Sequence, residues 1–302
     1  MKNDNANNKI STSQLKLLSD EFLQTYSNKS LQTIKTYQKA LNEFFFFYDV
    51  DIEFYFNSED IERYKSYLQN TKKLVDHSIH TYLTALRRFI NFLDSKQIIN
   101  KLKAKGFKYK IKPKNKKQNF LTSKQIKILI DNISRKKIEG LRDIAIINLI
   151  ATTGLSENDV STMKVSDFKL HRKKFSVTYL RDNKEFIMVL QDQTGMSINE
   201  YLVERDKGTT IKENPLFCSH SNRSSHQPIT IRGIKEMLRL RFEELQINDK
   251  SKNNFTPISL RNSGVIFQLL KGKKLEYIMH ILPLKHKPTA EKYFTFMKNF
   301  TS

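Results

Sequence analysis

The chain is poor in the residues that build cross-linked or fibrous proteins, since its 302 residues include one cysteine, 8 glycines and 6 prolines. So few glycines and prolines exclude a collagen-like chain, and the lone Cys218 excludes a disulfide-stabilised scaffold. A single thiol is typical of the reducing cytoplasm, where we expect the protein to act. The sequence has no run of about 18 apolar residues that would predict a membrane span, and residues 1–10 are too polar for a secretory signal.

Acidic residues are scarce relative to basic ones, with 31 Asp and Glu against 53 Lys and Arg and a net charge of +22. Such a surplus usually means a polyanionic partner, most often a nucleic acid. The alternative is a lysine-rich surface inherited from an AT-rich genome, since Lys, Asn, Ile and Phe are all abundant. The clustering of the charge favours a nucleic-acid partner, because residues 101–117 contain nine lysines and no acidic residue.

The first hundred residues have the apolar spacing of a helical bundle. We predict four helices, which cover about residues 14–26, 30–48, 58 onwards and 78–93. In the last helix the apolar side chains form one continuous stripe, and Arg87 and Arg88 lie off that stripe and face solvent. The aromatic run at residues 44–48 is too apolar for one face of a helix, so we expect it to pack in the core on more than one side.

The lysine-rich segment separates these helices from a region with both helices and strands. Length alone suggests two domains. We predict a helical domain over residues 1–100, a linker over residues 101–119 and a second domain over residues 120–302. Within the second domain, residues 141–153 are apolar enough to form a buried helix that ends at Gly154.

The second domain has further helix and strand signals. Its predicted helices cover about residues 122–133, 141–153, 157–164, 230–245, 260–270, 275–282 and 289–298. Residues 174–180 and 185–190 flank a short polar stretch and predict a β-hairpin. The predicted fold class is therefore mainly α with a small antiparallel sheet.

Two segments of the second domain carry ordered motifs. The first contains Thr-Gly-Leu-Ser-Glu at residues 153–157, and the second contains Thr-Pro-Ile-Ser-Leu-Arg-Asn-Ser at residues 256–263 and leads to Tyr293. This arrangement resembles the catalytic domain of the tyrosine recombinases, the phage-integrase and Xer group. The N-terminal helices are similar to the SAM-like core-binding domain of that family, so the resemblance covers most of the chain.

The resemblance implies a site-specific recombinase or integrase that acts on double-stranded DNA and is encoded by a bacterium or a mobile element. Members of this family cut DNA with a tyrosine, form a 3′-phosphotyrosine bond and release a 5′-hydroxyl, without a metal or other cofactor. The resemblance also implies assembly on DNA as a tetramer, or pairing with a partner recombinase. Cys218, His220 and His226 lack an evident fourth ligand, so we predict no zinc site.

Two catalytic groups of the family have direct matches in the chain. Arg261 matches the arginine of the family's His-x-x-Arg motif, and Tyr293 matches the nucleophile, eleven residues after Leu282. Guanidinium groups stabilise the negative charge that a phosphodiester gains in its transition state. Arg181 stands where the family has a lysine in its hairpin, and Lys184 is the other candidate for that role.

Three further family positions hold other residue types. Ser156 stands in place of an arginine, and Ile258 and Leu284 each stand in place of a histidine. His286 or His280 could supply a missing imidazole. Because removing one transition-state donor typically costs about 10²–10³ in rate, the alternative function is a catalytically impaired relative that binds DNA or assists an active recombinase.

Basic residues in three places are the predicted DNA contacts, which position the protein on phosphates without reading sequence. They are Arg87 and Arg88 in the helical domain, Lys108, Lys110, Lys112 and Lys114 in the linker, and Arg232, Lys235 and Arg239 in the helix over residues 230–245. Each neutralised phosphate releases counterions, so we expect binding to weaken steeply as salt increases. A basic RNA-binding protein is a more distant alternative, because the aromatic motifs of such proteins are absent.

Overall fold

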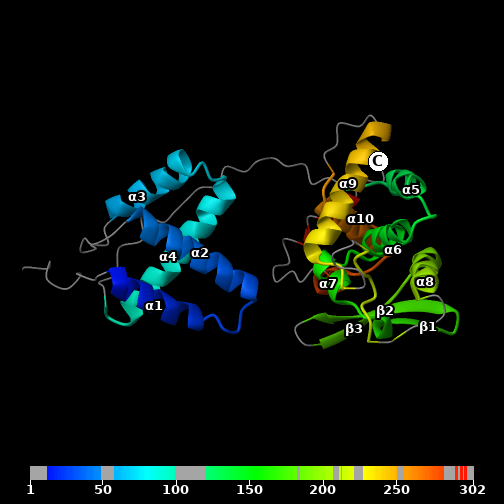
Figure 1. The fold of residues 1–302 in the computed structure, drawn as a ribbon, viewed down its shortest axis with the longest axis horizontal. Helices are drawn as coiled ribbons and strands as arrows, with labels where there is room; N and C mark the ends of the chain where they lie inside the picture. Colours follow the sequence, from blue (N-terminus) through cyan, green and yellow to red (C-terminus); the bar gives the residue numbers. More distant parts are fainter. Residues whose placement is uncertain are drawn as a thin grey trace, which may run out of the picture. The chain divides into compact units, whose positions relative to one another are not determined.

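The computed structural model describes residues 12–48, 58–98, 120–181, 184–206, 211, 213–220, 227–249, 255–281, 290–291, 293–294 and 296–297. The chain divides into two compact units, Met1–Asn115 and Lys116–Ser302 (Figure 1). The predicted linker lies outside the described residues, so the domain boundaries stay a prediction. The same holds for the contacts of its lysines, Lys108, Lys110, Lys112 and Lys114. None of the described helices is both long and apolar enough to cross a membrane.

The N-terminal unit is a bundle of helices, as predicted. Its elements are α1 (Thr12–Gln24), α2 (Leu31–Phe47), α3 (Ser58–Ser66), the π-helix η1 (Tyr67–Thr71) and α4 (Asp76–Ser95). Helix α2 begins after Ser30 because the Ser30 hydroxyl accepts the backbone N–H of Thr33. Buried side chains from all of these elements form one hydrophobic cluster, which gives this unit a core of its own.

Helix α4 buries the predicted apolar stripe. Its side chains that are at most 2% exposed include Ile79, Leu83, Leu86, Phe89, Ile90 and Leu93. Arg87 and Arg88 lie on the exposed side, as predicted. The aromatic run of α2 departs from the prediction at one position, because Phe44 and Phe45 are buried whereas Phe46 is 70% exposed. The outer face of α2 therefore presents an aromatic ring to solvent.

The second unit combines helices with a small sheet. Its elements are α5 (Ser123–Asp131), α6 (Ile138–Thr153), α7 (Glu157–Thr162), η2 (Val165–Asp167), β1 (Phe168–His171), β2 (Lys174–Arg181), β3 (Lys184–Val189), α8 (Asp192–Asp206), α9 (Ile231–Asp249), α10 (Pro257–Leu270) and α11 (Leu275–Ile281). The sheet is antiparallel throughout, in the order β1-β2-β3. The predicted hairpin is β2–β3, and β1 and α8 are elements that the sequence patterns did not predict. The predicted fold class is confirmed.

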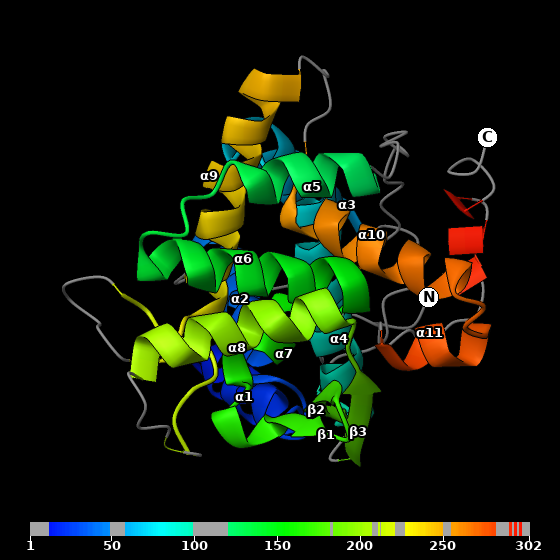
Figure 2. The same cartoon turned by 90° about the vertical axis from the view of Figure 1, so that its right-hand side faces the viewer.

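Helix α6 forms the centre of this unit and packs against α8 and α10 (Figure 2). It is apolar around most of its circumference, as a helix covered on several sides must be. Its last turn closes at Gly154, whose φ of 75° lies in the left-handed region that favours glycine. The prediction of a buried helix ending at Gly154 is therefore correct, and this end of α6 meets the elements that carry the candidate catalytic residues.

Candidate active site

Helix α10 places Arg261 at the end of α6. The helix begins with Pro257 at its first turn, where a missing backbone N–H costs nothing, and Thr256 precedes it in a capping box with Ser259. Arg261 is partly buried, and its Nε donates a hydrogen bond to the backbone oxygen of Gly154 at 3.0 Å. The guanidinium is thus fixed by a contact between two segments that are distant in the sequence.

Tyr293 meets the same helix one residue further on. Its Oη donates a hydrogen bond of 2.9 Å to Oδ1 of Asn262, and its ring packs edge-on against Phe296 with 6.2 Å between centroids. The side chain is only 7% exposed. Burial raises the pKa of Tyr293 above the usual value for a phenol, while the positive charge of Arg261 acts in the opposite direction. The structure therefore holds a neutral phenol within electrostatic reach of the Arg261 guanidinium.

Of the three altered family positions, two lie among the described residues and neither supplies a positive charge. Ser156 caps α7: its hydroxyl accepts the backbone N–H of Asp159 and donates to the Asp159 carboxylate at 2.6 Å. Ile258 lies in the first turn of α10 and is 58% exposed. Leu284 and its predicted substitute His286 lie outside the described residues.

The β2–β3 hairpin carries two further candidates at its tip. Arg181 and Lys184 are directly paired across the strands, and Lys184 is exposed. The described part of Arg181 is its backbone. Two residues from Lys184 on β3, the ring of Phe186 lies 5.5 Å from the ring of His280 on α11. His280, a predicted substitute for the missing imidazole, therefore packs against an aromatic side chain of the hairpin.

The predicted DNA contacts on α9 differ in whether they form ion pairs within the helix. Arg232 and Lys235 are exposed. Arg239 is also exposed, but it forms ion pairs with Glu236 and Glu243 on its own helix. Arg239, one of the three predicted DNA contacts on α9, is therefore already paired with two carboxylates of its own helix.

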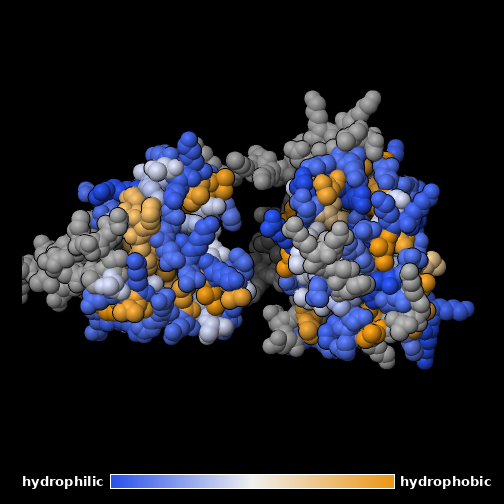
Figure 3. Space-filling model, viewed as in Figure 1, coloured by the Kyte–Doolittle hydropathy of each residue, from blue (hydrophilic) through white to orange (hydrophobic). Residues whose placement is uncertain are grey.

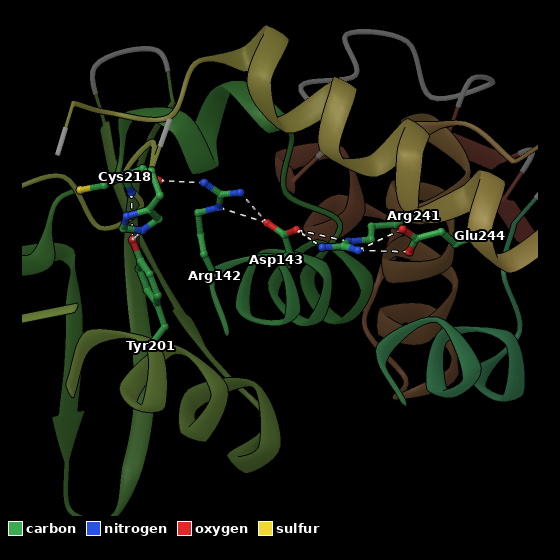
Figure 4. Close-up of polar contacts among 7 residues, drawn as sticks. Arg142, Asp143, Tyr201, Cys218, Arg241 and Glu244 are labelled. Atoms are coloured by element: carbon green, nitrogen blue, oxygen red, sulfur yellow. Dashed lines mark hydrogen bonds and ion pairs between the residues drawn. The ribbon is translucent and has the colours of Figure 1, made fainter. Parts of the chain in front are cut away.

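Arg142 and Asp143 form an ion pair, and the pair belongs to a larger network (Figure 4). Asp143 is only 3% exposed and accepts hydrogen bonds at 2.8 Å from Arg142 and, on its other oxygen, from Arg241 of α9. Arg142 also donates to the backbone oxygen of Cys218 at 3.2 Å. The buried carboxylate joins α9 to α6, and Arg142 joins the segment at Cys218 to the same helix. These arginines therefore have a structural role.

The Cys218 region contains no metal site among the described residues, where no group of three or more His, Cys, Asp and Glu side chains is suited to hold a metal ion. The Tyr201 hydroxyl accepts the backbone N–H of Cys218 at 3.1 Å and lies 3.1 Å from Nε2 of His220. These contacts hold the segment against α8. His226 lies outside the described residues.

The N-terminal unit has a basic groove of about 410 Å³ that the sequence analysis missed. It lies along the outer face of α2 and is lined by Lys35, Gln38, Lys39, Asn42, Glu43, Phe46 and Lys72. Glu43 is neutralised there by Lys72 at 2.9 Å, and it also accepts a hydrogen bond from the Tyr67 hydroxyl. Figure 3 shows hydrophilic side chains over most of the visible face, with separate hydrophobic patches. The spacing of Lys35, Lys39 and Asn42 on one helix face was the available signal.

Arg88 is engaged within this unit. Its guanidinium lies over the rings of Tyr26 and Tyr37, with 6.0 and 5.7 Å to the centroids, and donates to the Tyr26 hydroxyl at 3.4 Å. This hydrogen bond also raises the pKa of Arg88. Arg87, the other predicted DNA contact on α4, is exposed.

Comparison with known proteins identifies the family. Residues 119–298 match the model of the phage integrase family, and residues 61–109 match that of the phage integrase N-terminal SAM-like domain. The chain belongs to the phage integrase family. The resemblance to tyrosine recombinases and the predicted pair of domain types are thereby confirmed.

Individual relatives in this family are similar over most of the chain. The tyrosine recombinase XerC of Staphylococcus haemolyticus is 24% identical over 281 residues, covering 90% of this chain and 88% of the relative. The TnP I resolvase of Bacillus thuringiensis is 23% identical over 217 residues, covering 69% of this chain and 74% of the relative.

Two solved structures share the fold of the chain. The XerH site-specific recombinase bound to its difH substrate has a TM-score of 0.65 at 19% identity, covering 94% of this chain and 82% of that one. The Tn1549 transposon integrase in complex with circular intermediate DNA has a TM-score of 0.68 at 12% identity, covering 92% and 94%.

Proposed function

We propose that this phage integrase family member is a site-specific DNA recombinase that breaks and rejoins strands through Tyr293. The observation that carries the proposal is the hydrogen bond from Tyr293 to Asn262, which ties the phenol to the residue after Arg261 on α10. The positive charge of Arg261 acts on this phenol, where it opposes the rise in pKa that burial causes. An oxygen nucleophile next to a guanidinium combines the two elements that attack on a phosphodiester most needs, a nucleophile and a stabiliser of the developing charge. Family membership supports the same reaction class.

In the proposed reaction, Oη of Tyr293 attacks the scissile phosphorus, a new O–P bond forms, and the bond from phosphorus to the 5′ oxygen breaks. The products are a 3′-phosphotyrosine and a strand ending in a 5′-hydroxyl. The phenol loses its proton to solvent or a base, and the departing 5′ oxygen gains one. Arg261 stabilises the negative charge on the phosphoryl oxygens, and Lys184 or Arg181 at the hairpin tip supplies the second positive charge.

The altered positions set an expectation for the rate. Ser156 and Ile258 supply neither a guanidinium nor an imidazole, and each missing transition-state donor costs about 10²–10³ in rate when it is removed from a complete site. Such losses are not additive within one site. We therefore propose slow strand cleavage rather than none.

Double-stranded DNA is the proposed substrate, bound by both units. On the N-terminal unit, Arg87 and the α2 groove with Lys35 and Lys39 offer positive charge to phosphates, and on the second unit Arg232 and Lys235 do the same. We propose assembly on DNA as a tetramer or with a partner recombinase. The proposed place of action is the bacterial cytoplasm, on a chromosome or a mobile element.

The test is covalent trapping on a nicked duplex taken from the DNA that flanks the gene. Cleavage near the nick releases a short fragment, so the rejoining step is lost and any protein–DNA adduct accumulates. We expect the wild-type protein to form an adduct that survives denaturation, and Tyr293→Phe to form none while binding DNA with the same affinity. Tight, salt-sensitive binding without any adduct would reject the proposal in favour of the impaired, DNA-binding relative.

A further inference from the structure

Helix α10 packs against α6 (Figure 2). Their backbones come closest together at Gly264 of α10 and the segment from Ile150 to Gly154 at the end of α6. A β-carbon on Gly264 would lie 2.4 Å from the backbone nitrogen of Gly154 and 2.4 Å from the backbone oxygen of Ile150. Neither atom can swing away as a side chain would, since the two are themselves hydrogen-bonded at 2.9 Å in the last turn of α6. Glycine is therefore the residue that this contact admits.

The same face of α10 carries the candidate catalytic arginine. Arg261 lies three residues before Gly264 and Gln268 lies four after it, a spacing that puts all three on one face of a helix. Arg261 donates from Nε to the oxygen of Gly154 at 3.0 Å, and Gln268 donates from Nε2 to the oxygen of Thr152. Gly264 thus lies between two hydrogen bonds that join α10 to the end of α6.

We propose that Gly264 is a positioning residue for Arg261: by admitting backbone contact with Gly154, it sets the distance at which the guanidinium reaches the scissile phosphate. The inference rests on the proposed function, because it gives Arg261 a role in strand cleavage. An ordinary van der Waals contact begins at 3.4 Å, so a methyl group at Gly264 requires a separation of about 1 Å beyond the present 2.4 Å. A displacement of that size exceeds the tolerance of the 3.0 Å bond from Arg261.

The expected consequence follows from the geometry of catalysis. A catalytic group misplaced by about 1 Å can cost about 10²-fold in rate. We expect Gly264→Ala to slow adduct formation by about that factor, and Arg261→Ala by about 10²–10³. The competing explanation is that Gly264 serves packing alone, in which case any loss would follow from a less stable fold.

Two control variants separate positioning from stability. A β-carbon on Gly195 of α8 would lie 2.0 Å from the ring of Phe175, so Gly195→Ala disturbs a packed contact that does not involve α10. The shortest contacts of a β-carbon on Gly233 of α9 are 3.3 Å, to side-chain atoms, so Gly233→Ala tests a helix glycine with little crowding. All variants are compared as full chains at a temperature where circular dichroism shows them folded.

The discriminating measurement compares two nicked substrates. One carries the natural phosphodiester at the scissile position, and the other carries a methylphosphonate, in which a methyl group replaces a charged oxygen. A neutral linkage needs far less stabilisation from a guanidinium. If Gly264 positions Arg261, Gly264→Ala and Arg261→Ala both form the adduct more slowly than wild type on the phosphodiester. On the methylphosphonate, both variants form it at a rate within a small factor of wild type. Equal slowing on both substrates, or a wild-type rate on the phosphodiester, overturns the inference.

A second measurement does not depend on cleavage. The ¹⁵N–¹H signal of Arg261 Nε, assigned by its loss in Arg261→Lys, reports the bond to Gly154 through slow exchange with water. We expect slow exchange in wild type and Gly195→Ala and faster exchange in Gly264→Ala; unchanged exchange in Gly264→Ala overturns the inference. If the wild-type protein forms no adduct, the proposed function fails, and this signal still decides whether Gly264 holds Arg261 in place.

Discussion

The hydrogen bond between Tyr293 and Asn262 predicts a measurable coupling between the two side chains. Both are buried, at 7% and 2% exposed, and the bond is 2.9 Å long. Replacing Asn262 with alanine leaves the Tyr293 hydroxyl without this acceptor at a buried position, and a buried hydroxyl left unsatisfied costs about 1–3 kcal/mol. In the background of Tyr293→Phe the hydroxyl is absent, so that part of the cost disappears.

A double-mutant cycle isolates this interaction from the other contacts of Asn262. The free energies of unfolding of wild type, Asn262→Ala, Tyr293→Phe and the double variant are measured in urea by far-ultraviolet circular dichroism. Only the unfolding transition of the second unit is compared. It is the transition whose midpoint stays the same in variants that destabilise the N-terminal core. We expect a coupling energy of about 1–3 kcal/mol. Additivity within about 0.3–0.5 kcal/mol would refute the reasoning, because independent sites behave in that way.

Two further predictions concern buried charge and buried phenols in the second unit. Asp143→Asn removes the carboxylate that neutralises Arg142 and Arg241, whose side chains are 12% and 23% exposed. Calorimetry should therefore show a free energy of unfolding lower by about 3–5 kcal/mol and an unfolding midpoint lower by about 6–20 °C. The control is Asp131→Asn, because the exposed ion pair of Asp131 with Lys127 contributes about 0–1 kcal/mol, and equal effects of the two substitutions would refute the prediction. Burial raises the pKa of Tyr201 to about 12, so the native state keeps a proton that the unfolded phenol loses near pH 10, and stability falls as pH rises from about 10 toward 12. Urea titrations should show a shallower decline in Tyr201→Phe, and an identical decline in both proteins would reject this assignment.

The periodic patterns of the sequence predicted the helices that have a single apolar stripe and the helix that is apolar around most of its circumference. Helix α4 buries its apolar stripe from Ile79 to Leu93. Helix α6 ends at Gly154 because its last turn is closed by a residue in the left-handed conformation, which glycine adopts without strain. Helix α8 escaped prediction because its buried residues include Thr194, Gly195 and Ser197, which carry no hydrophobic signal. Strand β1 escaped because four residues are too few to show alternation.

The candidate site was predictable where the motif spacing is fixed and unpredictable where contacts cross the chain. Arg261 and Tyr293 are predicted from their positions in the motifs, but nothing in the sequence shows that Asn262 accepts the phenol hydrogen bond or that Gly154 accepts from Arg261. These bonds join residues 31 and 107 positions apart. Such pairings depend on how helices pack, which local patterns do not encode.

In the proposed reaction, the phenol oxygen of Tyr293 is the atom that bonds to the cleaved strand. The most direct test is to digest the trapped protein–DNA adduct with protease and nuclease and to sequence the nucleotide-bearing peptide by mass spectrometry. We expect a phosphotyrosyl link on Tyr293 alone among the 12 tyrosines of the chain. A link on another tyrosine, or on a serine, would contradict it.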